Sequence, residues 1–130
     1  MKKFSDLFNI ENLDPKERAD FIYNLALNHS TAPETLKLLA QDTSLDVLRA
    51  LAINPNTSSE TLTELAEVWG GSMVRYFSTI LFALTWNPNL PVGVAKILRE
   101  DEKLVQAISR NKGVADMRRM LKRLDEIIEG

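Results

Sequence analysis

A motif that recurs four times constrains the fold of this chain more than any other feature of its sequence. In each copy a large apolar residue is followed three positions later by Ala and then by a second large apolar residue, and Asn comes three positions after that. One copy has Asn in place of Ala. This spacing places the apolar residues on one face of a helix. The four copies are Phe21-Asn24-Leu25-Asn28, Val47-Ala50-Leu51-Asn54, Ile80-Ala83-Leu84-Asn87 and Leu104-Ala107-Ile108-Asn111.

A second apolar triplet follows each copy at the same helical spacing. Because a short helix cannot cover its own apolar face, neighbouring units must bury these triplets against one another. The sequence therefore predicts two short helices per repeat. The second triplets are Leu36-Leu39-Ala40, Leu62-Leu65-Ala66, Val94-Ile97-Leu98 and Met117-Met120-Leu121.

The repeated Asn residues coincide with signals that end helices. Pro55 follows Asn54 and Pro88 follows Asn87, and Pro cannot continue a helix. Asn tolerates the left-handed backbone conformation that often follows a last helical turn. We therefore expect each Asn to satisfy backbone groups at a helix end, and Asn54→Ala to lower stability rather than to abolish a binding activity selectively.

Signals that start helices occur at matching places. Asp14, Pro15 and Glu17 form a cap, a first-turn proline and a capping-box glutamate. The run 57–59 (Thr-Ser-Ser) offers a further N-cap. Since no segment alternates like a strand, the chain is predicted to be all-α, with about eight or nine short helices.

The distances between successive repeated Asn residues are 26, 33 and 24 residues. The seven additional residues of the central unit correspond to about two helical turns. They include Gly70, Gly71 and Ser72, followed by apolar residues that extend the stripe of Ile80. We expect this additional sequence to lengthen the helix before Asn87 rather than to form a long loop.

These repeats resemble the leucine-rich repeat variant family. The segments 48–57 (LRALAINPNT), 60–62 (ETL) and 64–66 (ELA) are similar to its unit, V-R-x-x-V-A-x-N-P-x-T-P followed by L, L and L-A. The similarity covers about residues 21–121 and is weakest where Asn111-Lys112-Gly113 replaces the Asn-Pro turn. It implies a right-handed superhelix of alternating α and shorter, often 3₁₀, helices. The best-known member carries an iron–sulfur cluster on an N-terminal Cys motif, and this chain has no Cys to hold one.

The predicted architecture is a right-handed α-solenoid of about four helix-pair repeats in a single domain, residues 1–130. Its expected parts are an N-terminal capping segment (1–20), the repeats (21–121) and a C-terminal capping helix (114–129). A chain of 130 residues with 45% hydrophobic content can bury a core without disulfides or a metal.

Composition and motifs argue against several classes of function. The formal net charge of -2 creates no general attraction for nucleic acid or anionic lipid, and no segment resembles a membrane span. The single His, His29, takes the turn position that Pro55 fills in the next repeat. Gly70 and Gly71 lack the Lys and the spaced glycines of a phosphate loop. We therefore expect a cytoplasmic protein with no catalytic site, no cofactor and no metal.

Two aromatic residues of the third repeat form the first candidate site. Phe82 and Trp86 lie four positions apart, on a helix side distinct from the apolar stripe. The positions equivalent to Phe82 hold Tyr23 and Arg49, so this side is predicted to be partly exposed and to bind a protein. In the alternative interpretation, the longer central helix buries more of both its sides.

Basic residues near the C-terminus form the second candidate site. Residues 1–65 carry a net charge of -4 and residues 66–130 a net charge of +2. Such a basic stripe can contact phosphates, although the exposed side of a terminal capping helix has the same pattern. The candidate residues are Arg110, Lys112, Arg118, Arg119, Lys122 and Arg123.

The sequence therefore predicts a non-catalytic interaction module, an adaptor or an inhibitor, that recognises an unidentified protein partner through Tyr23, Arg49, Phe82 and Trp86. Nucleic-acid binding through the basic C-terminal stripe is the alternative. Self-association through the long apolar helix 72–86 is a third hypothesis, so that we expect a monomer or a weak homodimer.

Overall fold

The computed structural model describes residues 10, 12–41, 44–69 and 74–130, with side chains left out at 69 and 74–77. Over these residues the chain forms eight helices and no strand, which confirms the all-α prediction. The helices are α2 (Pro15–Leu27), α3 (Pro33–Leu39), α4 (Leu45–Ile53), α5 (Ser59–Trp69), α6 (Val74–Thr85), α7 (Val92–Glu100), α8 (Glu102–Lys112) and α9 (Val114–Glu129).

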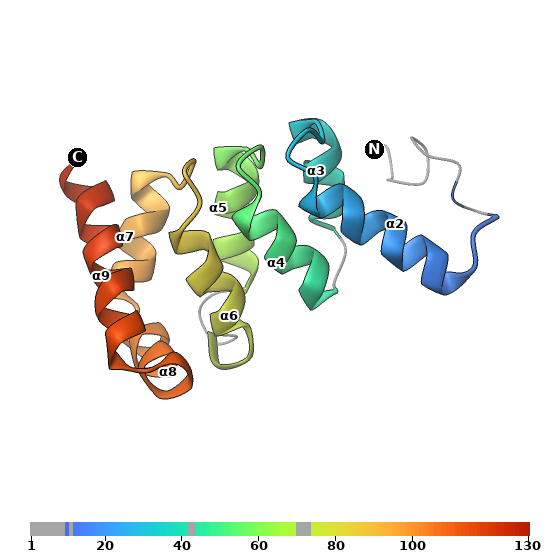
Figure 1. Ribbon diagram of the computed structural model, residues 1–130. Helices are drawn as coiled ribbons and strands as arrows, with labels where there is room; N and C mark the ends of the chain where they lie inside the picture. The colour runs from blue at the N-terminus through green and yellow to red at the C-terminus, as the bar shows by residue number, and fades with distance from the viewer. Residues whose placement is uncertain (1–9, 11, 42–43, 70–73) are drawn as a thin grey trace.

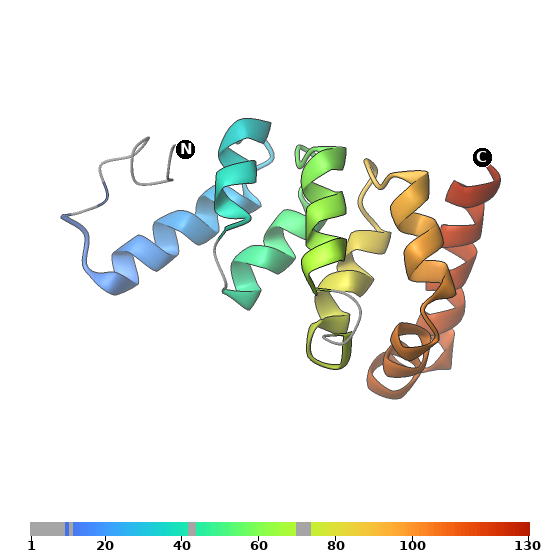
Figure 2. The same ribbon diagram turned by 180° about the vertical axis from the view of Figure 1, so that it is seen from behind.

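The helices alternate between two layers. In one layer α2 packs on α4, α4 on α6 and α6 on α8. In the other, α5 packs on α7, and α9 packs on both α7 and α8 and so closes the end of the two layers. The chain advances from α2 at one end to α8 and α9 at the other (Figure 1). Seen from behind, α3 and α5 lie in front of the layer that contains α4 (Figure 2).

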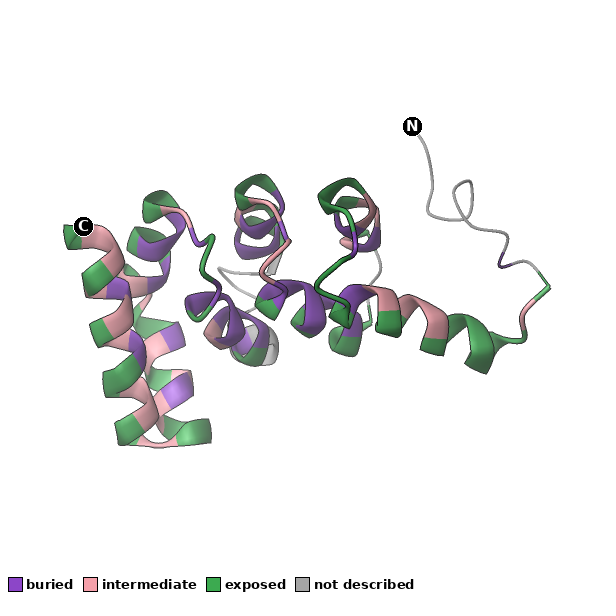
Figure 3. Ribbon diagram, turned by 45° about the horizontal axis from the view of Figure 1, so that its top comes forward, coloured by how far each residue is buried: buried purple, intermediate pink, exposed green. Residues whose placement is uncertain are grey.

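The predicted apolar triplets form one continuous core between the layers. Val47 and Leu51 of α4 and Ile80 and Leu84 of α6 are buried in it. Figure 3 shows buried positions on the sides of the helices that face one another. One triplet position is wrong: Ile97 is 53% exposed, and the buried neighbours of its helix are Val94, Ala95 and Leu98.

The seven additional residues of the central unit lengthen two helices rather than one. α5 has 11 residues against 7 in α3, and α6 has 12 against 9 in α4. The prediction of additional helix is confirmed, but α5 takes four of the seven residues and α6 takes three. Gly70, Gly71 and Ser72 lie outside the described residues.

Several predicted helix starts are confirmed by hydrogen bonds. The carboxylate of Asp14 accepts a hydrogen bond from the Glu17 backbone N–H at 2.8 Å. This bond holds the pKa of Asp14 below its ordinary value, because the ionised carboxylate is the better acceptor. At the start of α5, Ser58 Oγ accepts from the Thr61 N–H at 3.2 Å. The C-terminal helix spans the predicted range, Val114–Glu129.

Most of the N-terminal part of the predicted capping segment, residues 1–9 and 11, lies outside the described residues. Ile10 is buried, and α2 begins at Pro15. None of the helices in the described part of the chain combines the length and the apolar character that crossing a membrane requires.

Candidate functional site

The turns that follow α2 and α4 have extended backbone at their Asn residues. Asn28 has φ -72° and ψ 119°, and Asn54 has φ -70° and ψ 121°. Positive φ occurs in the described residues only at Gly113 and Gly130. The prediction of left-handed Asn is therefore wrong. From this extended conformation the buried Asn54 carboxamide reaches the preceding turn, whereas the exposed Asn28 carboxamide accepts a hydrogen bond from the Ser30 N–H of its own turn.

The carboxamide of Asn54 joins its own turn to the preceding one. Asn54 Oδ1 accepts a hydrogen bond from the Asn56 N–H at 2.8 Å, and Asn54 Nδ2 donates to the carbonyl oxygens of Ala26 at 2.7 Å and Asn28 at 3.1 Å. We call this series of turns, at Asn28, Asn54 and Asn87, the asparagine ladder.

The next step of the ladder repeats the same geometry. Asn87 Oδ1 accepts from the Asn89 N–H at 2.9 Å, and Asn87 Nδ2 donates to the carbonyl oxygens of Ala52 at 2.8 Å and Asn54 at 2.9 Å. Both donating Asn side chains belong to fully buried residues, so these bonds form away from water. The expected backbone-satisfying role holds, but the amide donates to the preceding turn rather than to its own helix.

A second set of side chains adds bonds along the outside of the ladder. Asn56 Nδ2 donates to the carbonyl oxygen of Thr31 at 2.8 Å, and Asn89 Nδ2 donates to that of Thr57 at 3.1 Å. Within one turn, the buried Thr57 hydroxyl donates to the Leu51 carbonyl oxygen at 2.7 Å. Two Asn residues per turn therefore hold neighbouring turns in register.

The ladder ends on an arginine rather than on a fourth asparagine. Asn111 lies inside α8 and is exposed, so the fourth copy of the sequence motif does not form an equivalent turn. Arg123 of α9 instead donates from Nε to the Thr85 carbonyl oxygen at 3.1 Å and from Nη2 to that of Asn87 at 3.2 Å. Arg123 thus donates to the carbonyl oxygens of Asn87 and of the residue two positions before it. The same two positions accept at the other steps, where Asn54 donates to the turn at Asn28 and Asn87 donates to the turn at Asn54.

Because the ladder aligns the turns, residues at equivalent positions lie in rows across α2, α4 and α6. The residue before each ladder Asn is a large exposed apolar residue: Leu27 is 37% exposed, Ile53 48% and Trp86 43%. The row five positions before each Asn holds Tyr23, which is 38% exposed, Arg49 and Phe82. We call the surface made by these two rows the open face. Of the four predicted protein-binding residues, Tyr23, Arg49 and Trp86 are exposed and Phe82 is half-buried.

The aromatic pair on the open face has defined contacts. The ring centroids of Phe82 and Trp86 lie 5.9 Å apart in an edge-to-face arrangement. Lys112 Nζ lies 5.1 Å from the Phe82 ring centroid, within the range of a cation–π interaction. Phe82 also packs partly against the core. Partial exposure, predicted for this side, is confirmed most clearly at Trp86.

The basic candidates do not form one free cluster. Arg123 faces the ladder end and is only partly exposed, so its prediction as a surface phosphate contact is corrected. Arg119 forms an ion pair with Asp116, and Lys112 lies over Phe82. Arg110, Arg118 and Lys122 remain as exposed cations on α8 and α9.

The apolar side of the long central helix is used inside the chain. Ile80, Leu81 and Leu84 of α6 are almost completely buried in the core. Self-association through this apolar side would require the core to open, which corrects that part of the third hypothesis for the described residues.

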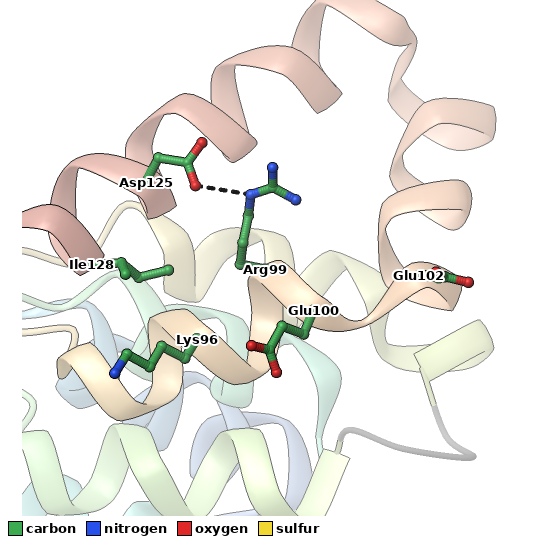
Figure 4. Close-up of a pocket in the computed structure, with 6 residues that line it drawn as sticks. All are labelled: Lys96, Arg99, Glu100, Glu102, Asp125 and Ile128. Atoms are coloured by element: carbon green, nitrogen blue, oxygen red, sulfur yellow. Dashed lines mark hydrogen bonds and ion pairs between the residues drawn. The ribbon is translucent and has the colours of Figure 1, made fainter.

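A hollow of about 690 Å³ lies between α7, the start of α8 and α9 (Figure 4). Its side chains carry both charges, and Arg99 Nε contacts Asp125 Oδ1 at 2.9 Å across it. In the described part of the chain no three His, Asp or Glu residues are grouped as metal ligands. His29 is exposed in the turn after Asn28, where the sequence placed it.

Comparisons with protein-family models, curated proteins and solved structures give no significant match.

Proposed function

We propose that the chain is a helical solenoid that recognises another protein through its open face and catalyses no reaction. The observation that supports this proposal best is the exposed row of Leu27, Ile53 and Trp86, which the asparagine ladder aligns. The repeated ladder bonds also support a stack of helix pairs, like the leucine-rich repeat variant units that the sequence resembles.

The composition of the open face suits protein recognition. Tyr, Trp and Arg are the residue types most often found to dominate the binding energy of interfaces, and Tyr23, Trp86 and Arg49 all lie here. Packed helices are about 8–10 Å apart, so the row of large apolar residues spans roughly 20 Å. A row of this length on fixed helices loses little conformational freedom when it binds a partner.

Protein recognition is favoured over nucleic-acid binding by the contacts of the basic residues. Arg123 and Arg119 have acceptors inside the chain, and the three exposed cations that remain are spread over two helices. Counterion release gives substantial affinity for nucleic acid only when several cations contact phosphates together.

The proposal is tested with Ile53→Ala/Trp86→Ala, because both side chains are exposed and neither is part of the core. The matched control is Val92→Ala/Ile97→Ala, which removes exposed apolar side chains from α7 in the other layer. Affinity capture from a lysate of the native host, quantified by mass spectrometry, compares both variants with the unaltered chain.

We expect a protein that is captured by the unaltered chain and the control but is reduced at least tenfold with Ile53→Ala/Trp86→Ala. Circular dichroism of this variant should show unchanged helical content. Equal capture by all three chains would overturn the assignment of the open face.

A further inference from the structure

The helix α6 ends differently from α2 and α4. The last residue of α2 is Leu27 and that of α4 is Ile53, each directly before its ladder Asn. The last residue of α6 is Thr85, two positions before Asn87. Trp86 therefore lies just outside its helix, although the equivalent residues of the open face lie inside theirs.

The backbone hydrogen bonds at the ends of α2 and α4 are those of an α-helix. The Asn28 N–H donates to the carbonyl oxygen of Asn24, four positions earlier, at 3.0 Å. The Asn54 N–H donates to that of Ala50, also four positions earlier, at 3.0 Å, and makes a longer bond of 3.3 Å to that of Leu51. Both helices thus keep their α-helical spacing up to the ladder Asn.

The bonds at the end of α6 span one residue less. The Trp86 N–H donates to the carbonyl oxygen of Ala83 at 3.1 Å, and the Asn87 N–H donates to that of Leu84 at 3.0 Å. Each bond joins residues three positions apart, which is the pattern of a 3₁₀ helix. The helix α6 therefore closes with a tighter turn than α2 and α4.

A threonine hydroxyl accompanies the α-helical ending in the first two turns. Thr31 Oγ1 donates to the Leu25 carbonyl oxygen at 2.8 Å, and Thr57 Oγ1 donates to that of Leu51 at 2.7 Å. Each threonine comes three positions after its ladder Asn, and each accepting carbonyl group comes three positions before it. The hydroxyl thus supplies a donor to this carbonyl oxygen.

The third turn has Leu90 at the position of the two threonines. Leu90 has no hydroxyl, and its side chain is buried in the core. The corresponding carbonyl oxygen belongs to Leu84, which is fully buried. A buried carbonyl oxygen without a donor is unfavourable, and the tighter turn supplies one, the Asn87 N–H.

We propose that Leu90 is a positioning residue for Trp86 on the open face. Because Leu90 offers no hydroxyl to the Leu84 carbonyl oxygen, α6 ends in a 3₁₀ turn. Such a turn rotates the chain by about 120° per residue, against about 100° in an α-helix. The Trp86 side chain therefore leaves the helix in a different direction from the other apolar residues of its row, and its ring lies 5.9 Å from that of Phe82.

A second difference between the turns is Thr85, at the position that Ala26 and Ala52 have in the first two. The Thr85 hydroxyl donates to the Leu81 carbonyl oxygen at 3.4 Å, within the helix. This bond involves neither of the carbonyl oxygens that accept at the end of α6, so it does not account for the 3₁₀ turn. The variant Thr85→Ala separates its effect from that of Leu90.

The inference rests on the proposed function, since it concerns how the open face presents Trp86. Its test compares Leu90→Thr, which restores the hydroxyl, with Thr57→Val, which removes the hydroxyl of the preceding turn at nearly constant side-chain size. Thr85→Ala is the control. Scalar couplings across hydrogen bonds, measured by NMR in the ¹⁵N,¹³C-labelled chains, identify the carbonyl group that accepts each Asn N–H.

In the unaltered chain and in Thr85→Ala, the Asn87 nitrogen should couple to the carbonyl carbon of Leu84. In Leu90→Thr this coupling should move to the carbonyl carbon of Ala83. A coupling that stays at Leu84 in Leu90→Thr, or that moves to Ala83 in Thr85→Ala, would overturn the inference.

Thr57→Val is the reverse experiment and leaves the core packing of Leu90 unchanged. The main coupling of the Asn54 nitrogen should move from Ala50 to Leu51. If Leu90→Thr does not fold, this variant decides alone, and an Asn54 nitrogen that still couples mainly to Ala50 would overturn the inference.

The effect on binding is measured by the same affinity capture, with Val94→Thr as the control because it makes a similar change at a buried position of α7. Leu90→Thr, but not Val94→Thr, should reduce capture of the protein that requires Trp86 by at least about threefold, since Trp residues often dominate interface energies. Equal capture by Leu90→Thr and the unaltered chain would overturn the positioning role.

The two proposals can fail separately. The couplings of Asn54 and Asn87 depend on no partner, so they test the origin of the 3₁₀ turn even if no protein binds the open face. Equal capture by the unaltered chain and Ile53→Ala/Trp86→Ala would overturn the proposed function without changing these couplings.

Discussion

In the central turns and at the C-terminal end of this molecule, equivalent pairs of backbone carbonyl oxygens accept hydrogen bonds from different side chains. At Asn54 and Asn87, one carboxamide joins two carbonyl oxygens of the preceding turn. At the end of the stack, the guanidinium of Arg123 joins the carbonyl oxygens of Thr85 and Asn87. The comparison shows that backbone groups exposed by one turn must be satisfied by whatever follows, whether or not the sequence motif continues.

The two kinds of donor differ in how they reach the ladder. A ladder Asn lies in the turn itself, and its carboxamide also accepts an N–H two residues later, which fixes the side chain locally. Arg123 comes from the middle of α9, 36 residues after Asn87. The packing of α9 on α7 and α8 therefore decides whether the last carbonyl oxygens find a donor.

The largest effect on the free energy of unfolding is expected when Asn87 is replaced. Asn111 has the same place in the sequence motif and serves as the comparison. Asn87→Ala removes the donor to the Ala52 carbonyl oxygen and the acceptor of the Asn89 N–H, whereas the Asn54 carbonyl oxygen keeps the Thr57 N–H. Leaving such buried groups unpaired should lower the free energy of unfolding by about 2–3 kcal/mol. Asn111→Ala, on the exposed surface of α8, should change it by less than about 0.5 kcal/mol.

Urea unfolding followed by circular dichroism measures both free energies. Equal losses of stability in the two variants would show that the buried carboxamide has no special role and would remove the distinction between the central and terminal turns.

A smaller effect is expected at the end of the ladder. Arg123→Ala removes the donor to the Thr85 carbonyl oxygen, while the Asn87 carbonyl oxygen keeps the Leu90 N–H. Because this region is partly exposed and water can replace the guanidinium, the loss should be about 1–2 kcal/mol. Arg118→Ala, an exposed change on the same helix, serves as the control and should be nearly neutral in urea unfolding.

Should Arg118→Ala destabilise the chain as much as Arg123→Ala, the terminal donor would be no more important than any cation of α9. The sequence hypothesis that treats these arginines as one surface stripe would then regain support.

Much of the fold could be predicted from the sequence because its determinants are local. Apolar spacing, capping residues such as Asp14, and Pro after Asn each act within a few residues. The interaction between turns could not be predicted in this way. The partner of Asn54 Nδ2 is a carbonyl oxygen 28 residues earlier, and nothing near Arg123 indicates that it donates to the turn at Asn87.

The candidate site was predicted in part. Alignment on the repeated Asn residues predicts one row for Tyr23, Arg49 and Phe82, and in the structure Tyr23 and Arg49 are exposed while Phe82 is half-buried. The sequence does not predict Leu27 and Ile53 as binding residues, although both are exposed, as is Trp86 at the equivalent position before Asn87. Exposure depends on what lies opposite a side chain, and an aliphatic residue looks the same in a sequence whether it is buried or exposed.

Hydrogen exchange of the Asn side-chain amides tests the asparagine ladder most directly. In a ¹⁵N-labelled sample transferred to D₂O, the Nδ2 protons of Asn54 and Asn87 should exchange at least about tenfold more slowly than those of the exposed Asn24 and Asn111, because buried hydrogen-bonded protons exchange only after local opening. Equal exchange rates at all four side chains would contradict the ladder.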